Sequence, residues 1–187
     1  MSKWSKVKKT YVYAEKQLPA GINIQDSMRP FLSNLAIAYL LAEKLGVDKV
    51  SLRNNIAKAF DTLGIKVLTK GNVTILDDSF NSNPKGFQAA LDVLSTYNGR
   101  KILITAGVIE LGSESSRIHR ELGDKIGTIC DVIILTNDNF EEPIREGLRK
   151  TMFDMSKLFV PKREELVLII KRQIQDKTVV LLEGRMP

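Results

Sequence analysis

The sequence has very few of the residues that form disulfides and transition-metal sites, with one cysteine and one histidine among 187 residues. The single cysteine, Cys130, excludes an intrachain disulfide. One histidine and one cysteine also leave few soft metal ligands, so we predict no metal site. Cys130 lies in an apolar stretch, which is typical of a buried small hydrophobic side chain rather than of a nucleophile.

Long apolar runs are also missing from the sequence. No stretch approaches the roughly 20 apolar residues that span a bilayer. The charged start of the chain has no apolar segment behind it of the kind that secretory signals carry. We therefore expect a cytoplasmic protein that makes no membrane contact.

The excess of positive charge is concentrated at the start of the chain. The formal net charge is +6, and Lys3, Lys6, Lys8 and Lys9 supply four of these charges. A basic patch is one signature of nucleic-acid binding, but no combination of aromatic and basic residues recurs along the chain. We expect residues 1–29 to be a flexible start, and we predict no nucleic-acid partner.

Two helices are predicted in the first third of the chain. Residues 30–45 are apolar on nearly every side, which predicts a buried helix. Residues 52–63 have apolar side chains at helical spacing, with Ser51 as the expected N-cap. The sequence pattern changes after Gly64, so we interpret residues 1–63 as the terminal part of another domain.

From residue 64 to residue 187, short apolar strands alternate with helices. Runs such as Val132–Leu135 are apolar at consecutive positions, which is typical of strands covered on both faces of a parallel sheet. The alternation predicts an α/β domain with a doubly wound, mostly parallel sheet. The expected strands are residues 65–69, 72–77, 101–106, 131–136, 157–160 and 178–183, and the expected helices are residues 84–97, 114–129, 143–152 and 163–175.

Ligands of a doubly wound sheet bind beyond the carboxyl ends of its strands. Three loops of the predicted domain occupy such positions: residues 77–84, residues 107–116 and residues 137–142. The first two of these loops are rich in groups that can bind a ligand, so they are the candidate sites.

The first loop combines two carboxylates, Asp77 and Asp78, with the amides of Asn81 and Asn83. A helix start at Pro84 offers backbone N–H groups without helical partners, and such groups favour an anion or a polar ligand. The same residue types are also common in plain turns and N-caps. From the residues alone, both interpretations stay open.

The second loop has two glycines, Gly107 and Gly112, on either side of one acid, Glu110. Glycine allows a ligand or another backbone to approach closely. His119 lies one turn into the next helix, where a single histidine is more often structural than catalytic. A binding loop and a simple helix lead-in are both compatible with this pattern.

Four segments together resemble the Mur ligase family, and their order along residues 30–187 makes the resemblance fairly specific. The loop that ends in Asn83-Pro84 resembles that family's Asp-Asp-Ser-aromatic-Asn loop. The resemblance is strongest to the branch of the family that adds a dipeptide. The other similar segments are Glu110–Gly112 followed by His119–Gly123, the chain end Leu182–Arg185, and the helix that contains Asn34–Ala36.

The resemblance implies that residues 64–187 are a Mur ligase C-terminal domain and that residues 1–63 end the central ATPase domain. In such ligases, ATP and Mg²⁺ serve to phosphorylate a carboxylate of a UDP-muramoyl peptide. The amine of an amino acid or dipeptide then attacks the acyl phosphate. The C-terminal domain closes over the nucleotide and presents the amine.

The resemblance also implies roles for six residues, none of them catalytic or metal-binding. Three asparagines would contact the nucleotide, and the other three residues would contact the incoming substrate or orient their loops. The nucleotide-binding residues are Asn34, on the adenine side, with Asn81 and Asn83; the substrate-binding or loop-orienting residues are Asp78, Glu110 and His119.

The chain departs from the family pattern in what it lacks. It contains no Gly-x-x-x-x-Gly-Lys-Ser/Thr phosphate loop, and the family's magnesium-binding acids and modified lysine have no counterpart. We therefore expect the chain alone to hold no ATP or Mg²⁺ independently and to be inactive. The alternative is a non-catalytic module that binds nucleotide or peptide. Folate polyglutamylation is a more distant possibility, because that branch resembles a shorter Asp-Gly-Ala-His loop.

Overall fold

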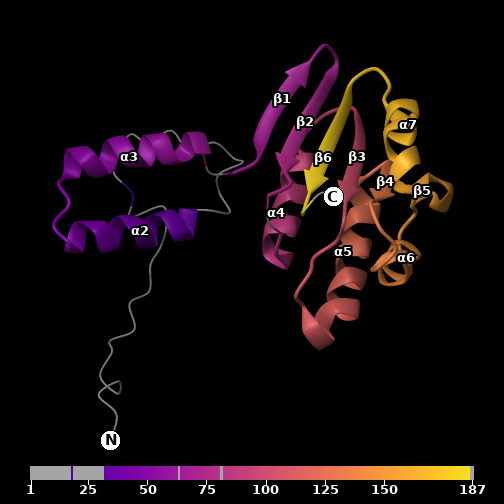
Figure 1. Ribbon diagram of the computed structural model, residues 1–187, viewed down its shortest axis with the longest axis horizontal. Helices are drawn as coiled ribbons and strands as arrows, with labels where there is room; N and C mark the ends of the chain where they lie inside the picture. Colours follow the sequence, from indigo (N-terminus) through magenta and orange to yellow (C-terminus); the bar gives the residue numbers. More distant parts are fainter. Residues whose placement is uncertain (1–17, 19–31, 63, 81, 186–187) are drawn as a thin grey trace, which may run out of the picture. The chain divides into compact units, whose positions relative to one another are not determined.

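The computed structural model describes residue 18 and residues 32–62, 64–80 and 82–185 (Figure 1). The chain divides into two compact units, residues 1–64 and residues 65–187. The start of the chain, which we predicted to be flexible, lies outside the described residues apart from Leu18.

The first unit contains two helices, α2 (Leu32–Lys44) and α3 (Lys49–Thr62), as predicted. The expected N-cap of α3 was wrong, because the helix begins before Ser51. The Ser51 backbone N–H donates to Asp48 Oδ1 at 2.8 Å, so Asp48 caps the helix. The hydrogen bonds from Ser51 also lower the pKa of Asp48.

Helix α2 is less buried than its apolar composition predicted. Leu32, Leu35 and Ala36 are buried, but Ile37 and Leu41 are 46% and 58% exposed. A helix that is apolar on every side needs partners all round, and the described part of this unit, which has only one other helix, covers one side. No described helix of the chain is long and apolar enough to cross a membrane.

The second unit is built on one six-stranded sheet. Its strands are β1 (Lys66–Lys70), β2 (Val73–Asp78), β3 (Arg100–Thr105), β4 (Val132–Leu135), β5 (Leu158–Phe159) and β6 (Thr178–Glu183). Its helices are α4 (Pro84–Ser95), α5 (Ser115–Ile129), α6 (Glu141–Leu148) and α7 (Arg163–Gln173), with short 3₁₀ turns η2 (Gly112–Glu114) and η3 (Met155–Lys157).

The strand order is β1-β2-β6-β3-β4-β5. Strand β1 forms an antiparallel hairpin with β2, and every other neighbouring pair is parallel. The structure therefore confirms the predicted mostly parallel α/β sheet. The last strand, β6, lies between β2 and β3, in the middle of the sheet.

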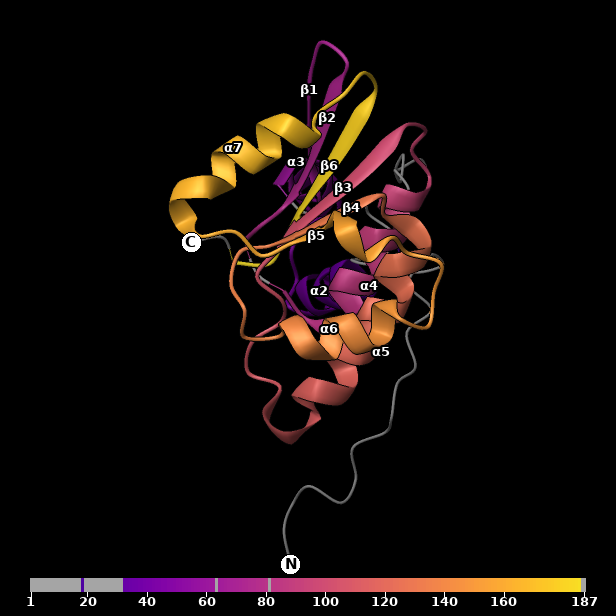
Figure 2. The same cartoon turned by 90° about the vertical axis from the view of Figure 1, so that its right-hand side faces the viewer.

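Helices cover both faces of this sheet (Figure 2). The larger core lies on the face of α4, α5 and α6, and includes Phe87, Leu122 and Ile144. The smaller core lies on the other face, where Leu166 and Ile170 of α7 pack against the strands. Both faces of the central strands are thus buried, which explains their uninterrupted apolar runs.

Helices α5 and α6 approach each other closely at two glycines. A Cβ atom on Gly123 would lie 2.4 Å from the Ile144 carbonyl oxygen, and one on Gly147 would lie 2.1 Å from the Arg120 carbonyl oxygen. Both obstacles are backbone atoms, which cannot move aside as a side-chain end can. Helix α6 therefore packs in this position only because both residues lack a side chain.

We predict that Gly147→Ala lowers the free energy of unfolding by about 1–3 kcal/mol, the usual cost of overpacking. Gly86→Ala in α4 is the matched control, because its Cβ would meet only the side-chain amide of Asn83, at 3.2 Å. We expect Gly86→Ala to be neutral or to stabilise by up to about 1 kcal/mol. Denaturant unfolding measures both variants, and equal effects would contradict this account of the α5–α6 contact.

Candidate functional site

The candidate site lies where β2, β6 and β3 end at one edge of the sheet. Asp78 is in register with Glu183, and Glu183 is in register with Thr105. In-register residues of parallel strands point to the same face, so these three side chains form a polar row across the sheet. Two residues earlier on each of these strands, the side chains on the same face are apolar and belong to the larger core. They are Leu76, Leu181 and Leu103.

Two residues of the first loop have local structural roles. Asp77 Oδ1 accepts hydrogen bonds from the Ser79 hydroxyl at 2.5 Å and from the Ser79 backbone N–H at 3.1 Å. Asn83 is the N-cap of α4, and its Oδ1 accepts from the Gly86 backbone N–H at 2.9 Å. For Asp77 and Asn83, the contacts are those of a turn residue and a cap residue.

Glu183 is the most deeply buried acid of the site, with no exposed surface. The Ser82 hydroxyl donates to its Oε1 at 2.6 Å. Its other oxygen, Oε2, has no conventional donor among the described residues. A buried carboxylate oxygen without a donor costs free energy, so the ionised form of Glu183 is disfavoured.

Asp78 and Glu183 act as a pair. Burial and, to a smaller extent, the negative charge of Asp78 raise the pKa of Glu183 to about 8, against the opposing effect of the hydrogen bond from Ser82. Burial and the charge of Asp77 also raise the pKa of Asp78, but a hydrogen bond from Glu183 opposes that rise. At neutral pH, Glu183 therefore holds a proton and donates it to the ionised Asp78, as two adjacent carboxyl groups commonly do.

His119 holds the second loop in place from α5. Its Nε2 accepts a hydrogen bond from the Val108 backbone N–H at 3.0 Å, and its Nδ1 lies 2.8 Å from the Ser115 carbonyl oxygen. These partners require the neutral ring with the proton on Nδ1. The ring is fully buried and stacks on Phe140 at 3.9 Å between centroids, and burial lowers its pKa. Through these contacts His119 anchors the second loop, and its role at a substrate site stays a prediction.

The second loop has an unusual backbone at Glu110. Glu110 has a backbone φ of 64°, in the left-handed region that residues other than glycine rarely adopt. Holding a residue there costs about 1–3 kcal/mol, and such residues are concentrated at functional sites. Its side chain is exposed beyond the end of β3, on the same edge of the sheet as Asp78. A substrate-binding role for Glu110 stays a prediction.

The three predicted nucleotide-binding residues belong to different parts of the chain. Asn34 is exposed on α2, in the first unit. Asn81 lies outside the described residues. Asn83 uses its side-chain oxygen to cap α4, which leaves its amide nitrogen for a ligand. The nucleotide-binding role of all three stays a prediction.

Glu183 is the site residue that the sequence analysis missed. We noted it only as part of the chain end that resembles the family. The available signal was an acid directly after the apolar run Val179–Leu182, at the end of a predicted parallel strand. That position alone places a carboxyl group at the ligand-binding edge of the sheet.

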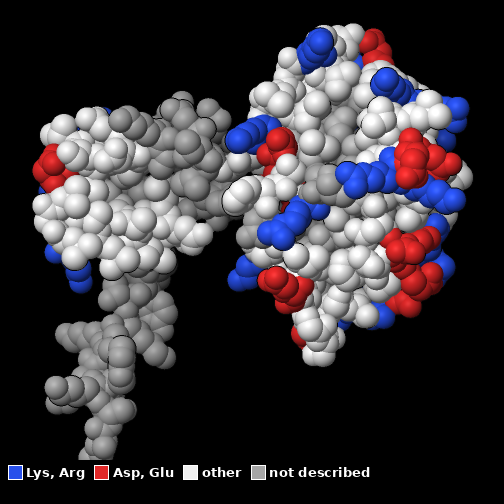
Figure 3. All heavy atoms as spheres, in the orientation of Figure 1, with Lys and Arg blue, Asp and Glu red and all other residues white. Residues whose placement is uncertain are grey.

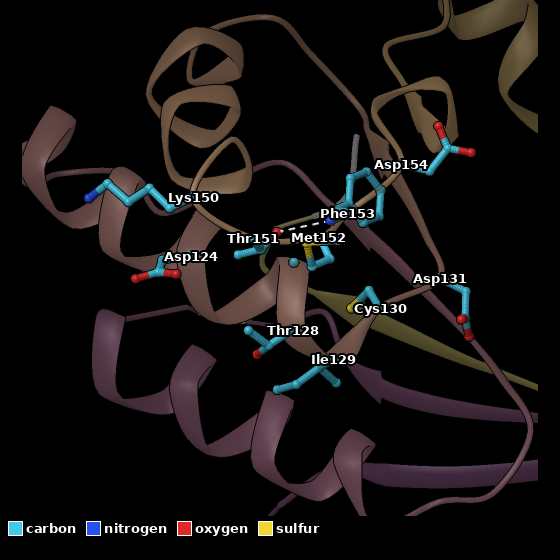
Figure 4. Close-up of a pocket in the computed structure, with 11 residues that line it drawn as sticks. Asp124, Thr128, Ile129, Cys130, Asp131, Lys150, Thr151, Met152, Phe153 and Asp154 are labelled. Atoms are coloured by element: carbon cyan, nitrogen blue, oxygen red, sulfur yellow. Dashed lines mark hydrogen bonds between the residues drawn. The ribbon is translucent and has the colours of Figure 1, made fainter.

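A hollow of about 610 Å³ lies at the opposite edge of the sheet, near the start of β4 (Figure 4). Cys130 is buried beside it, as predicted, and burial raises its thiol pKa, so it is a poor nucleophile. Met152 is fully exposed at this hollow. The polar atoms that we find both buried and unpaired in the described residues belong to Arg100, Thr136 and Glu183, none of which lines it.

Charged side chains of both signs are intermixed over the visible face of the second unit (Figure 3). Ion pairs such as Arg117 with Glu121 at 2.6 Å and Arg145 with Glu141 at 2.7 Å join neighbouring helical positions. Within the described ranges, no group of three or more His, Cys, Asp or Glu side chains is arranged to hold a metal ion.

The raised pKa of Glu183 predicts how stability depends on pH. Between its ordinary pKa of 4.5 and about 8, the folded chain keeps a proton that the unfolded chain has released. The free energy of unfolding therefore falls as pH rises, by up to about 1.4 kcal/mol per pH unit. His119 has the opposite effect on the free energy of unfolding below its ordinary pKa of 6.5, because there the unfolded chain binds a proton that the folded chain does not. The range from pH 6.5 to about pH 8 isolates the effect of the acid pair.

We predict that Glu183→Gln removes most of this fall, because glutamine cannot release a proton. Over that range the natural chain should lose up to about 2 kcal/mol of unfolding free energy, and the variant should be nearly constant. Glu121→Gln, on the exposed side of α5, should leave the slope unchanged. Chemical denaturation at several pH values provides the measurement, and parallel slopes for the natural chain and Glu183→Gln would refute the buried proton.

Comparison with known proteins places this geometry in a family. Residues 65–186 match the family described as "Mur ligase, glutamate ligase domain". The chain is 28% identical over 159 residues to the UDP-N-acetylmuramoyl-tripeptide–D-alanyl-D-alanine ligase of Haemophilus influenzae, covering 82% of this chain and 34% of that ligase. The Escherichia coli enzyme of the same name is 25% identical over 162 residues, with the same coverage of each chain.

Solved structures give the same result. The MurF ligase of Thermotoga maritima, crystallised in complex with ADP, superposes with a TM-score of 0.58 at 25% identity, covering 83% of this chain and 34% of that one. A MurF structure from Acinetobacter baumannii superposes with a TM-score of 0.64 at 25% identity and the same coverage. The chain thus spans about a third of the length of these relatives. Residues 65–186 are a Mur ligase C-terminal domain, and the chain belongs to the Mur ligase family.

Proposed function

We propose that this chain is the amine-presenting C-terminal part of an ATP-dependent, amide-bond-forming ligase of peptidoglycan precursor synthesis. The observation that carries the proposal is the acid pair Asp78–Glu183 at the ligand-binding edge of a Mur ligase domain. The relatives are named for joining D-alanyl-D-alanine to a UDP-N-acetylmuramoyl tripeptide. A UDP-muramoyl peptide and a dipeptide or amino acid are therefore the proposed substrates, and the cytoplasm is the proposed location.

We propose that the sites for the phosphates of ATP and for Mg²⁺ are supplied by another part of the complete enzyme. The sequence has no phosphate loop, and its described part has no cluster of metal ligands. We assign those groups to a central ATPase domain, of which residues 1–63 are the proposed end. The nucleotide contacts of Asn34, Asn81 and Asn83 would then be limited to the base and the ribose.

The contribution of this chain is to position the amine. Catalysis of this type depends on holding the reacting groups in a productive geometry. The rigid sheet holds Asp78 and Glu183, and the buried contacts of His119 hold the neighbouring loop. A negative charge at the sheet edge would attract the amine in its protonated form and orient it. The ammonium group must then lose a proton before its nitrogen can attack an acyl phosphate formed elsewhere in the complete enzyme.

A non-catalytic binding module is the second candidate. It is favoured by one observation, which is the missing phosphate loop. Both candidates predict that the chain alone releases no phosphate from ATP, so a further test must separate them.

The test is a chimera that joins the first two thirds of the Haemophilus influenzae ligase to this chain. We expect ATP-dependent addition of D-alanyl-D-alanine to the UDP-muramoyl tripeptide. Asp78→Asn in the chimera should reduce kcat/KM about tenfold to a hundredfold, the loss expected for a hydrogen bond to a charged group. Glu121→Gln is the control and should keep full activity.

The non-catalytic candidate predicts a different result. The chimera would fold and bind the UDP-muramoyl peptide, but it would form no amide bond. That outcome, with a parallel preparation of the intact Haemophilus influenzae enzyme active under the same conditions, would exclude the proposed ligase function.

A further inference from the structure

The outer side of helix α7 exposes apolar and charged side chains together. No residue of α7 is buried, and it is the only described helix of the second unit on its face of the sheet (Figure 2). Its inner side consists of Leu166, Ile169 and Ile170, which pack against the strands. Val167 and Leu168 are 59% and 50% exposed. The helix therefore has an apolar surface that no other described element covers.

Helix geometry determines which residues lie on this outer side. Successive residues of an α-helix are rotated by about 100°, so Glu164, Leu168 and Lys171 point away from the sheet. All three are exposed. Glu165 and Arg172, which are also exposed, lie along one edge of the same surface. These five residues form what we call the α7 stripe.

The charges of the α7 stripe are sorted by sign along the helix. Glu164 and Glu165 lie in the first turn, and Lys171 and Arg172 lie in the last turn. Acid and base are seven residues apart, or about 10.5 Å, whereas pairing on one helix needs a spacing of three or four. The ion pairs found among the described residues include no charge of α7. The helix dipole favours this order of signs, but it does not account for the exposed aliphatic side chains between them.

We propose that the α7 stripe is a contact between two copies of this chain, with the two helices antiparallel and Leu168 at the two-fold axis. Such an axis brings the start of each helix to the end of the other. Glu164 lies four residues before Leu168 and Lys171 lies three residues after it, so each Glu164 faces Lys171 of the second copy. Glu165 and Arg172, three residues before and four after, face each other in the same way. This contact is independent of the proposed function.

A second copy of the chain fits this surface because the stripe is complementary to itself in the antiparallel arrangement. A parallel pair would bring acid against acid and base against base, which disfavours association. Helix α7 has 11 residues and is therefore about 16 Å long. The contact is then smaller than the roughly 1,200–2,000 Å² that stable complexes bury. We expect a weak, reversible dimer with a dissociation constant of roughly 10–100 μM.

The experiment is analytical ultracentrifugation of the full 187-residue chain over a range of concentrations. We expect a monomer–dimer equilibrium that weakens severalfold when sodium chloride is raised from about 0.05 M to about 0.5 M, because salt screens exposed charges. Leu168→Lys places two like charges at the two-fold axis and should weaken the dimer at least about tenfold. Lys150→Glu is the control, because Lys150 is exposed after α6, which covers the other face of the sheet. This variant should associate like the natural chain.

Two charge-reversal variants test the antiparallel arrangement. One carries Glu164→Lys with Glu165→Lys, and the other carries Lys171→Glu with Arg172→Glu. Each variant alone should dimerise at least about tenfold more weakly than the natural chain, because like charges then face each other. An equimolar mixture of the two should form a heterodimer at least as tightly as the natural chain forms its dimer. Recovery in the mixture also establishes that α7 is still folded in both variants.

Three results would overturn the proposal. The first is a natural chain that stays monomeric up to about 1 mM. The second is a dimer that Leu168→Lys leaves unchanged, because association would then use another surface, such as the exposed Ile37 and Leu41 of α2. The third is a mixture of the two charge-reversal variants that associates no better than either variant alone.

Discussion

The placement of β6 between β2 and β3 is the constraint on which the site depends. This strand completes the sheet, and its register puts Glu183 beside Asp78 on one side and beside Thr105 on the other. Because parallel strands in register present their side chains to the same face, an apolar row of leucines ends in a polar row at the sheet edge. The last row of the core and the polar row of the candidate site are therefore consecutive rows of side chains on one face of the sheet.

The two loops at this edge are held by different interactions. The first is held by its own polar side chains, with Ser79 bonded to Asp77 and Asn83 bonded to the start of α4. The second is held from α5 by a buried, neutral His119 that is stacked on Phe140. A fixed edge of this kind suits a domain that presents one substrate to chemistry performed by another part of an enzyme.

The local pattern of the sequence was enough to predict the elements of the second unit. The apolar run Val132–Leu135 and the helix start at Pro84 are local features, and the structure confirms both. The pairing of Asp78 with Glu183 was not predictable in the same way, because it joins distant residues through the strand order. The burial of α2 was predicted wrongly, since composition shows that a helix needs partners but not whether they are present.

The central claim is that Glu183 keeps a proton at neutral pH and shares it with Asp78. The most direct measurement is a ¹³C titration of the Glu183 carboxyl group in the ligand-free chain, assigned with Glu183→Gln. We predict a midpoint near pH 8, together with a change in that midpoint when Asp78 is replaced by asparagine. A midpoint near the ordinary value of 4.5 would contradict the account.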